Sequence, residues 1–142
     1  MSTRSAIGFM DSTGTISAIY CHHDGYLRHV GQTLHKHYST PQKIQHLISL
    51  GDLSSLGAYI GEKHDFDSRP RDTCTFYHRD REEPWNETSP ESFLIVQDFV
   101  DAYNGVDFCY LNKEGVWYVK APGEQFVNLF DALETEREDQ SN

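Results

Sequence analysis

Several side chains capable of acid–base chemistry or ligand binding lie close together in the segment CHHDGY, residues 21–26. They follow an apolar run, and a helix is expected to begin soon after them. Where a strand ends and a helix begins, backbone N–H groups are free and the helix dipole favours anions. Gly25 permits a close turn there, and Asp24 can accept hydrogen bonds from nearby amides. The segment therefore predicts a polar site at the end of a strand.

A second group of charged and aromatic residues follows another short apolar run, at residues 77–85. Arginine binds carboxylates and phosphates through two parallel hydrogen bonds, and Tyr, Trp and Arg are enriched at binding hot spots. We expect both groups to converge on one side of a sheet. The residues of this predicted ligand- or partner-binding surface are His22, Asp24, Tyr26, Tyr77, Arg79, Asp80, Arg81 and Trp85.

The same residues also allow a purely structural interpretation. Asp24 would cap the following helix, His22 would bond a backbone carbonyl, and Arg79 or Arg81 would pair with a nearby acid. Trp85 would fold back onto the sheet instead of anchoring a partner. The sequence leaves both interpretations open.

A metal site is an alternative reading of the histidines. His22 and Asp24 would need a third ligand from His64, Asp65 or His78, and imidazole and carboxylate are suitable ligands. No HExxH spacing and no CxxC pair supports this reading. The three cysteines are far apart and are expected to be free, buried side chains. We therefore expect no metal and no cofactor.

The chain start, Met1-Ser2, allows a hydrolase in which a processed N-terminal serine is the nucleophile. That chemistry requires a free α-amine beside the hydroxyl, and Met1 would have to be removed first. A small hydrolase, metal-assisted or of this kind, remains the alternative to a binding role. The sequence has no nucleophile–base motif and no glycine loop for phosphates, so binding without reaction is favoured.

Length and charge narrow the class of protein. A chain of 142 residues fits one domain, 1–142, and its net charge of −10 argues against general nucleic-acid binding. The acidic end from about residue 134 is expected to fray in solvent. An acidic surface that imitates nucleic acid is a further alternative. No apolar run is long enough to span a membrane and no secretory signal opens the chain, so we expect a cytoplasmic protein.

The elements that must position these side chains follow from hydrophobic periodicity. Residues 5–10 are typical of a short strand and residues 11–14 of a turn. Residues 15–21 alternate between two faces, with Ile16, Ala18 and Tyr20 on one and Ser17, Ile19 and Cys21 on the other. Together they predict a hairpin. Apolar residues spaced by four predict a helix over residues 28–38. Thr40-Pro41 starts a second helix that Gly51 ends.

The same patterns predict the elements of the second half of the chain. Residues 50–57 are expected to form a compact turn. Residues 61–90 are expected to form a polar loop interrupted by a strand over residues 73–77. A helix is predicted from Ser89-Pro90-Glu91 onward, followed by a strand pair at 106–111 and 116–119 and a final helix over 126–133. The predicted fold is α+β: one antiparallel sheet with helices packed on one side.

Several motifs in a fixed order resemble a family of small bacteriophage and prophage proteins without an established biochemical activity. The matching segments are TRSAIGF at the start, YCHHDGY with the following VG, HY at residues 37–38, GDLSSLG at 51–57 and RDR at 79–81. The sequence departs from the family at Leu27-Arg28, where relatives often carry a proline-containing turn, so the helix entry is expected to be looser.

The resemblance covers about the first 80 residues and implies a viral origin and an accessory role in the host cytoplasm. Together with the residues above, it favours binding of a host protein or of a nucleotide-like ligand. A host-takeover or counter-defence role is the hypothesis that follows.

Overall fold

The computed structural model describes residues 2–141 of the chain, with side chains through residue 138. Its elements are β1 (Ser5–Met10), β2 (Ile16–Cys21), the π-helical turn η1 (Leu27–Gly31), α1 (Gln32–His37), α2 (Pro41–Ser49), β3 (Leu53–Ser55), β4 (Thr75–Phe76), α3 (Tyr77–Arg81), α4 (Trp85–Thr88), β5 (Glu91–Phe93), α5 (Val96–Ala102), β6 (Phe108–Lys113), β7 (Val116–Lys120), β8 (Val127–Asn128) and α6 (Leu129–Ser141).

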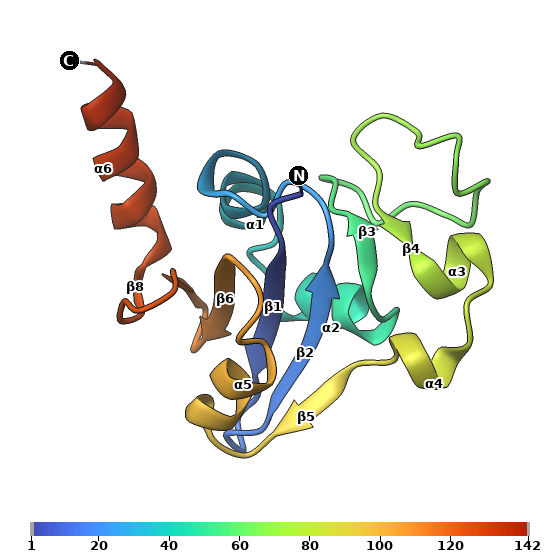
Figure 1. The fold of residues 1–142 in the computed structure, drawn as a ribbon, viewed down its shortest axis with the longest axis horizontal. Coiled ribbons are helices and arrows are strands. Elements are labelled where there is room, and N and C mark those ends of the chain that lie inside the picture. The colour runs from blue at the N-terminus through green and yellow to red at the C-terminus, as the bar shows by residue number, and fades with distance from the viewer. Residues whose placement is uncertain (1, 142) are drawn as a thin grey trace.

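One mixed, mostly antiparallel sheet forms the centre of the molecule (Figure 1). Its strands run in the order β4-β3-β2-β1-β6-β7-β8, and β5 also pairs with β2. The hairpins β1–β2 and β6–β7 are antiparallel, whereas β1–β6 and β2–β3 are parallel. The two predicted hairpins and the α+β class are confirmed.

Helices cover both faces of this sheet. On one face, Ile19 and Cys21 pack with α1, α2 and the start of α6 in the larger core. On the other face, Ala18 packs against Phe99 of α5 in a smaller core. The predicted layer of helices on one side consists of α1, α2 and α6. The short helix α5, which we did not expect there, lies on the other side. The alternating pattern of β2, with Ile16 and Ala18 opposite Ile19 and Cys21, is as predicted.

Local signals place several element ends correctly. The Thr40 hydroxyl accepts a hydrogen bond from the Lys43 amide, 3.3 Å away, and Pro41 follows at the first helical position. Gly51, at φ 87°, ends α2. The helix predicted over residues 28–38 begins with η1, whose Gly31 amide bonds the Tyr26 carbonyl five residues back.

Four predictions about elements are wrong. Residues 61–90, expected to be a loop with one strand, also contain the short helices α3 and α4. Residues 50–57 contain a strand, β3, instead of only a turn. Residues 91–93 are a strand and the helix begins at Val96, because β5 fills the edge of β2 that the short β3 leaves open at Ile16–Ala18. The last helix begins at Leu129 after a short strand, with the Asn128 side chain accepting a bond from the Asp131 amide. It continues through Ser141.

Between β3 and β5, the edge of β2 is completed by a side chain. The Tyr20 amide donates to the Asp52 carboxylate at 2.9 Å, in place of a backbone partner. The Asp52 amide and carbonyl are bonded to Thr88 and Tyr77. Burial raises the pKa of Asp52 from 3.8 to about 6. Asp52 is therefore a half-buried acid that joins the sheet to the α3–α4 segment.

All three cysteines are free and buried, as expected. No helix among the described residues is both long and apolar enough to cross a membrane.

Candidate functional site

The strand order brings the motif segments to one end of the sheet. β2 and β3 are parallel neighbours, so the residues that follow them leave the sheet at the same end. β1 is antiparallel to β2 and β4 is antiparallel to β3, so the residues that precede these two strands lie there too. We call this end, built from residues 2–5, 20–26, 53–58 and 69–73, the motif edge. In Figure 1 it lies beside the N-terminus, with α5 at the opposite end of the sheet.

Backbone hydrogen bonds hold the segments of the motif edge together. The Gly25 amide donates to the Thr3 carbonyl at 2.8 Å, and the His22 and His23 amides donate to Leu53 and Ser54. A Cβ atom on Gly25 would lie 2.8 Å from the Cβ atom of Ser5. Glycine is required there because the TRS and CHHDGY segments touch at backbone level.

A row of polar side chains covers one face of the sheet at this edge. We call Tyr20, His22, Ser54 and Tyr77 the polar face. The Tyr20 hydroxyl and His22 Nδ1 are 2.8 Å apart. Burial raises the pKa of Tyr77, and the nearby Ser54 hydroxyl partly offsets that shift. Arg69 reaches the same row, with Nη2 donating to the Ser54 hydroxyl at 3.3 Å.

His22 is held in its neutral form. Burial lowers its pKa, and the neighbouring His23 and Arg4 lower it further. With Nδ1 engaged by Tyr20, the remaining ring nitrogen is the one that can contact a ligand. His22 thus offers a hydrogen bond and no charge at neutral pH.

Alternating cations and aromatic rings border the polar face. The Phe66 ring lies 5.8 Å from the Tyr77 ring. The guanidinium of Arg81 lies 4.5 Å from the centre of Phe66 and 5.1 Å from that of Tyr77. Arg69 stacks on Phe66 at 5.1 Å. These contacts fasten the loop of residues 61–74 over the sheet and place two guanidinium groups beside it.

A polar groove of about 370 Å³ opens on the other side of Arg69. It runs between the start of α1, the exit of β3 and the 61–74 loop, and we call it the Asp24 groove. Its lining is Asp24, His29, Thr33, His37, Ser55, Leu56, Gly57, Ala58 and residues 69–73. Five non-glycine residues of the described chain have positive φ angles, and three of them, Asp24, Arg69 and Asp72, line this groove. Such strained backbone is concentrated at ligand sites.

Arg79 and Asp80 serve the loop instead of a ligand. The Asp80 side chain is fully buried and accepts hydrogen bonds from the amides of Phe76 and His64. Arg79 bonds Asp80 and also the carbonyl groups of Ile60, Gly61 and Cys74. The pair fastens both ends of the 61–74 loop to β4.

Trp85 lies on the other flank of α3. Its side chain is 42% exposed and meets the His78 ring edge-on at 5.1 Å. It borders an open groove of about 600 Å³, whose lining also includes Ser49, Leu50, Lys63, His78, Arg79 and Glu82. Trp85 also covers Gly51, so it is part packing residue and part surface.

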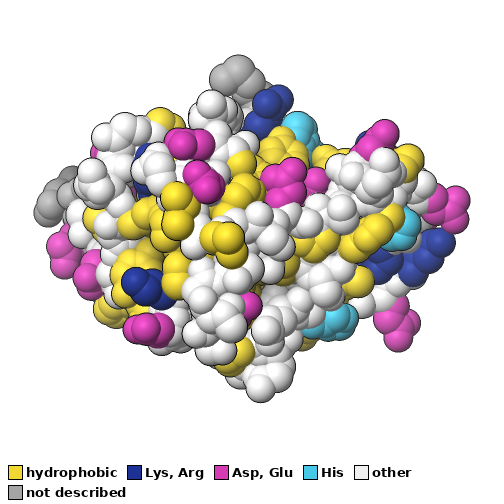
Figure 2. Space-filling view, turned by 90° about the horizontal axis from the view of Figure 1, so that it is seen from below, with side chains coloured by type: hydrophobic (Ala, Val, Ile, Leu, Met, Phe, Trp, Pro, Cys, Tyr) yellow, Lys and Arg dark blue, Asp and Glu magenta, His cyan; other side chains and the backbone are white. Residues whose placement is uncertain are grey.

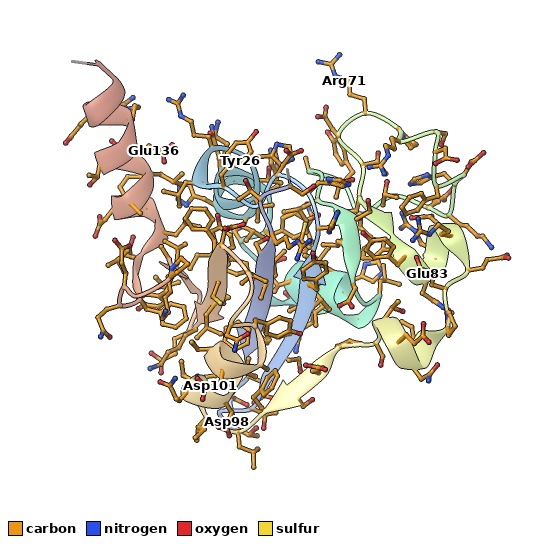
Figure 3. The ribbon with its side chains drawn as sticks, in the orientation of Figure 1. Tyr26, Arg71, Glu83, Asp98, Asp101 and Glu136 are labelled. Atoms are coloured by element: carbon orange, nitrogen blue, oxygen red, sulfur yellow. The ribbon has the colours of Figure 1, made fainter. Side chains whose placement is uncertain are left out.

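The predicted site residues therefore fall into separate groups. His22 and Tyr77 share the polar face, with Arg81 stacked beside them. Asp24 lies in the Asp24 groove, exposed and at φ 56°. Tyr26 lies beside α1, far from Glu83 and the α3 side of the molecule (Figure 3). Its ring contacts His29.

Residues that the sequence reading missed complete the polar face. Tyr20 and Ser54 belong to the polar face, Phe66 and Arg69 border it, and Arg4 lies at the same end of the sheet. Arg4 and Ser54 lie inside the TRSAIGF and GDLSSLG segments, so those motifs were the available signal. Nothing in the sequence singled out Phe66 or Arg69, which lie in a polar loop.

Two observations concern the N-terminal-serine hydrolase and the metal site, the alternatives that the sequence leaves open. The Ser2 hydroxyl lies 3.1 Å from His23 Nδ1, which is within hydrogen-bond reach. Over residues 2–138, no three His, Cys, Asp or Glu side chains form a group that could hold a metal ion.

Comparison of the chain with protein-family models, curated proteins and solved structures finds no match.

Proposed function

We propose that this chain is a phage- or prophage-encoded accessory protein that acts by binding a small nucleotide-like ligand, in a host-takeover or counter-defence role. The observation that carries the proposal is the motif edge itself. Three segments of the phage-like motif series, from TRS, CHHDGY and GDLSSLG, meet there. Their outward side presents the polar face and the Asp24 groove.

The chemistry of the motif edge favours retention of a ligand over its conversion. Arg79 and Asp80 already bond each other and the 61–74 loop. The lowered pKa of His22 favours its neutral form, and its Nδ1 is hydrogen bonded to the Tyr20 hydroxyl. Arginine, tyrosine and serine groups remain, which hold a polar ligand through hydrogen bonds and charge. A groove of this size is within the range of small-molecule sites.

The test is capture of the ligand from host extract. The purified protein is incubated with extract, washed and heated, and the released compounds are identified by mass spectrometry. We expect one compound in stoichiometric amount, chemically identical to the form found in the extract. Retention should fall for the His22→Ala and Asp24→Asn variants and persist for the Arg137→Gln variant on α6.

Two outcomes would contradict the proposal. Release of a converted product at many turnovers would make the protein an enzyme, and the hydrolase alternative would then apply. Absence of any stoichiometric ligand would contradict the proposed capture of a host ligand.

A host protein is the second candidate partner, favoured by the surface around Trp85. Figure 2 shows a band of hydrophobic side chains across the end of the molecule that carries β5 and α5. Leu94 and Ile95, between these elements, are 80% and 56% exposed. Trp85, on α4 at the start of this segment, is 42% exposed, and exposed apolar side chains and tryptophan are typical of protein interfaces.

A further inference from the structure

We propose that the motif edge contains a phosphate site in which Arg4 and Arg69 bind the anionic group of a nucleotide. This inference rests on the proposed function, because it names the ligand class and the charged subsite of the same surface.

Two arginines differ from the others of the chain in their ion pairing. The chain contains seven. Five form ion pairs with carboxylates, at nitrogen–oxygen distances between 2.5 and 3.8 Å: Arg28, Arg71, Arg79, Arg81 and Arg137. Arg4 and Arg69 have no carboxylate partner among the described side chains. The chain has 22 acidic and 12 basic residues, and both of these arginines lie at the motif edge.

The two arginines are held differently at the motif edge. Arg4 immediately precedes β1, next to Thr3, whose carbonyl accepts a hydrogen bond from the Gly25 amide. Burial raises the pKa of Tyr20 and lowers that of His22, and the charge of Arg4 adds a smaller downward effect on both. Asp107 bonds the Arg4 backbone amide and leaves the guanidinium free. Arg69 uses one nitrogen for the buried Ser54 hydroxyl and stacks on Phe66. Four of its five N–H groups stay available for an anion.

Arg69 is held in place by two contacts of its guanidinium. Its backbone has φ 43°, an uncommon conformation for a side-chain-bearing residue. Its guanidinium is nevertheless fixed at two points, Phe66 and Ser54, by a loop that Arg79 and Asp80 fasten. A preorganised guanidinium loses less entropy when it binds phosphate.

The Asp24 groove explains why the anion should belong to a nucleotide. Arg69 forms the boundary between the polar face and the groove. On the groove side, Asp24 and Asp72 supply acceptors and Ser55 and Thr73 supply hydroxyl groups. A phosphate would avoid those carboxylates, whereas sugar hydroxyls and base amino groups would donate to them. The two sides therefore suit the two halves of a nucleoside phosphate.

The experiment measures binding of defined probes to the full chain by amide NMR and calorimetry. The probes are inorganic pyrophosphate, the four ribonucleoside monophosphates and uncharged adenosine. We expect at least one monophosphate to bind more tightly than pyrophosphate, and adenosine to bind at least about tenfold more weakly than adenosine monophosphate. The shifted amides should lie in residues 2–5, 20–25, 54–58 and 69–73.

Three variants define the charged subsite. Arg4→Gln and Arg69→Gln should each weaken phosphate binding about tenfold or more, while Arg69→Lys should restore part of the affinity. Arg137→Gln, which removes the same charge on α6, should bind as the wild type does. Bound anion should also raise the pKa of His22, because a negative charge favours the imidazolium form. A merely structural role for the arginines would leave that pKa unchanged.

The proposal is overturned if adenosine binds as tightly as its monophosphate, if both glutamine variants bind normally, or if no phosphate probe shifts these amides at about 5 mM. If pyrophosphate binds and no monophosphate exceeds it, the phosphate site stands and the nucleotide assignment is wrong. Capture of a host ligand that both glutamine variants retain would overturn this inference and leave the proposed function intact. Phosphate binding without any captured host ligand would contradict only the proposed function.

Discussion

Arg79 and Asp80 are consecutive residues that form a buried ion pair, with Nε of Arg79 3.0 Å from Oδ1 of Asp80. The pair bonds the amides and carbonyl groups at both ends of the 61–74 loop. In the structure, Arg79 and Asp80, which we predicted to be ligand-binding residues, connect the 61–74 loop to β4. The position of the pair explains why the loop can hold Arg69 and Phe66 over the sheet.

Replacement of Asp80 should be strongly destabilising. In Asp80→Asn, the Arg79 charge would lose its partner inside the protein, and we expect a loss of about 3 kcal/mol of unfolding free energy. Chemical denaturation at pH 7 measures this loss. The matched control is Glu82→Gln, which removes an exposed carboxylate paired with Lys63 and should change stability by less than about 0.5 kcal/mol.

The Asp80 effect should also depend on pH. Burial raises the pKa of Asp80, but hydrogen bonds from Arg79, Phe76 and His64 outweigh it and hold the pKa below 3.8. A lowered folded-state pKa adds stability above pH 3.8 that is lost as the pH falls further. The difference between the wild type and Asp80→Asn should shrink in acid. An equal difference at pH 2 and pH 7 would contradict this assignment.

Asp52 should behave in the opposite way. Its folded-state pKa of about 6 lies above the ordinary 3.8, so the wild type should lose stability as the pH rises from about 4 through 6. Asp52→Asn keeps an oxygen for the Tyr20 amide and removes the buried charge. At pH 7.5 we expect it to be about 1 kcal/mol more stable than the wild type, allowing for partial exposure.

Thermal melts of the Asp52→Asn variant at several pH values provide the check. At pH 4 the two proteins should melt together. The exposed Asp98 of α5 supplies the control (Figure 3), because Asp98→Asn removes an equal charge at the surface. Lower stability of Asp52→Asn at pH 7.5 would show that the ionised carboxylate is needed by the sheet.

Gly57 should control the shape of the Asp24 groove. A Cβ atom there would lie 2.5 Å from the carbonyl carbon and oxygen of Asp72, so Gly57→Ala must push the loop outward. We expect a loss of about 1–3 kcal/mol and faster hydrogen exchange in residues 69–73. In Gly105→Ala the added atom has no neighbour within 4 Å, and stability should be unchanged or slightly higher. Equal exchange rates in both variants would argue against the close approach.

Trp85 should distinguish the second candidate function from packing. Because its side chain is 42% exposed, Trp85→Ala should cost about 1–2 kcal/mol, less than Phe99→Ala in the smaller core. If a host protein binds here, pull-down of that partner should be lost in Trp85→Ala at a temperature where the variant is fully folded. Retained binding in that variant would exclude Trp85 as the anchor. A loss as large as that of Phe99→Ala would make it a core residue.

Much of the fold could be predicted from local pattern. A short strand at residues 5–10, a turn with Asp11 and Gly14, and alternation in residues 15–21 predict the first hairpin, and Thr40-Pro41 and Gly51 bound α2. These features depend on neighbours in sequence, which is why the sequence is sufficient. The helix predicted at Ser89-Pro90-Glu91 was wrong for a complementary reason. Its start signal was local, but the open edge of β2 at Ile16–Ala18 paired with residues 91–93 instead.

The candidate site likewise has features that the sequence predicts and features that depend on the tertiary structure. The sequence by itself determined that the CHHDGY segment follows a strand and presents polar groups, and that Gly25 makes a close turn. Only the tertiary structure decided that the Arg79 guanidinium is hydrogen bonded to Asp80 and to loop carbonyl groups. It also decided that Arg4 and Arg69 have no carboxylate partner among the described side chains. Whether a charge is paired depends on distances of a few ångströms between segments far apart in the chain, and residue order does not contain those distances.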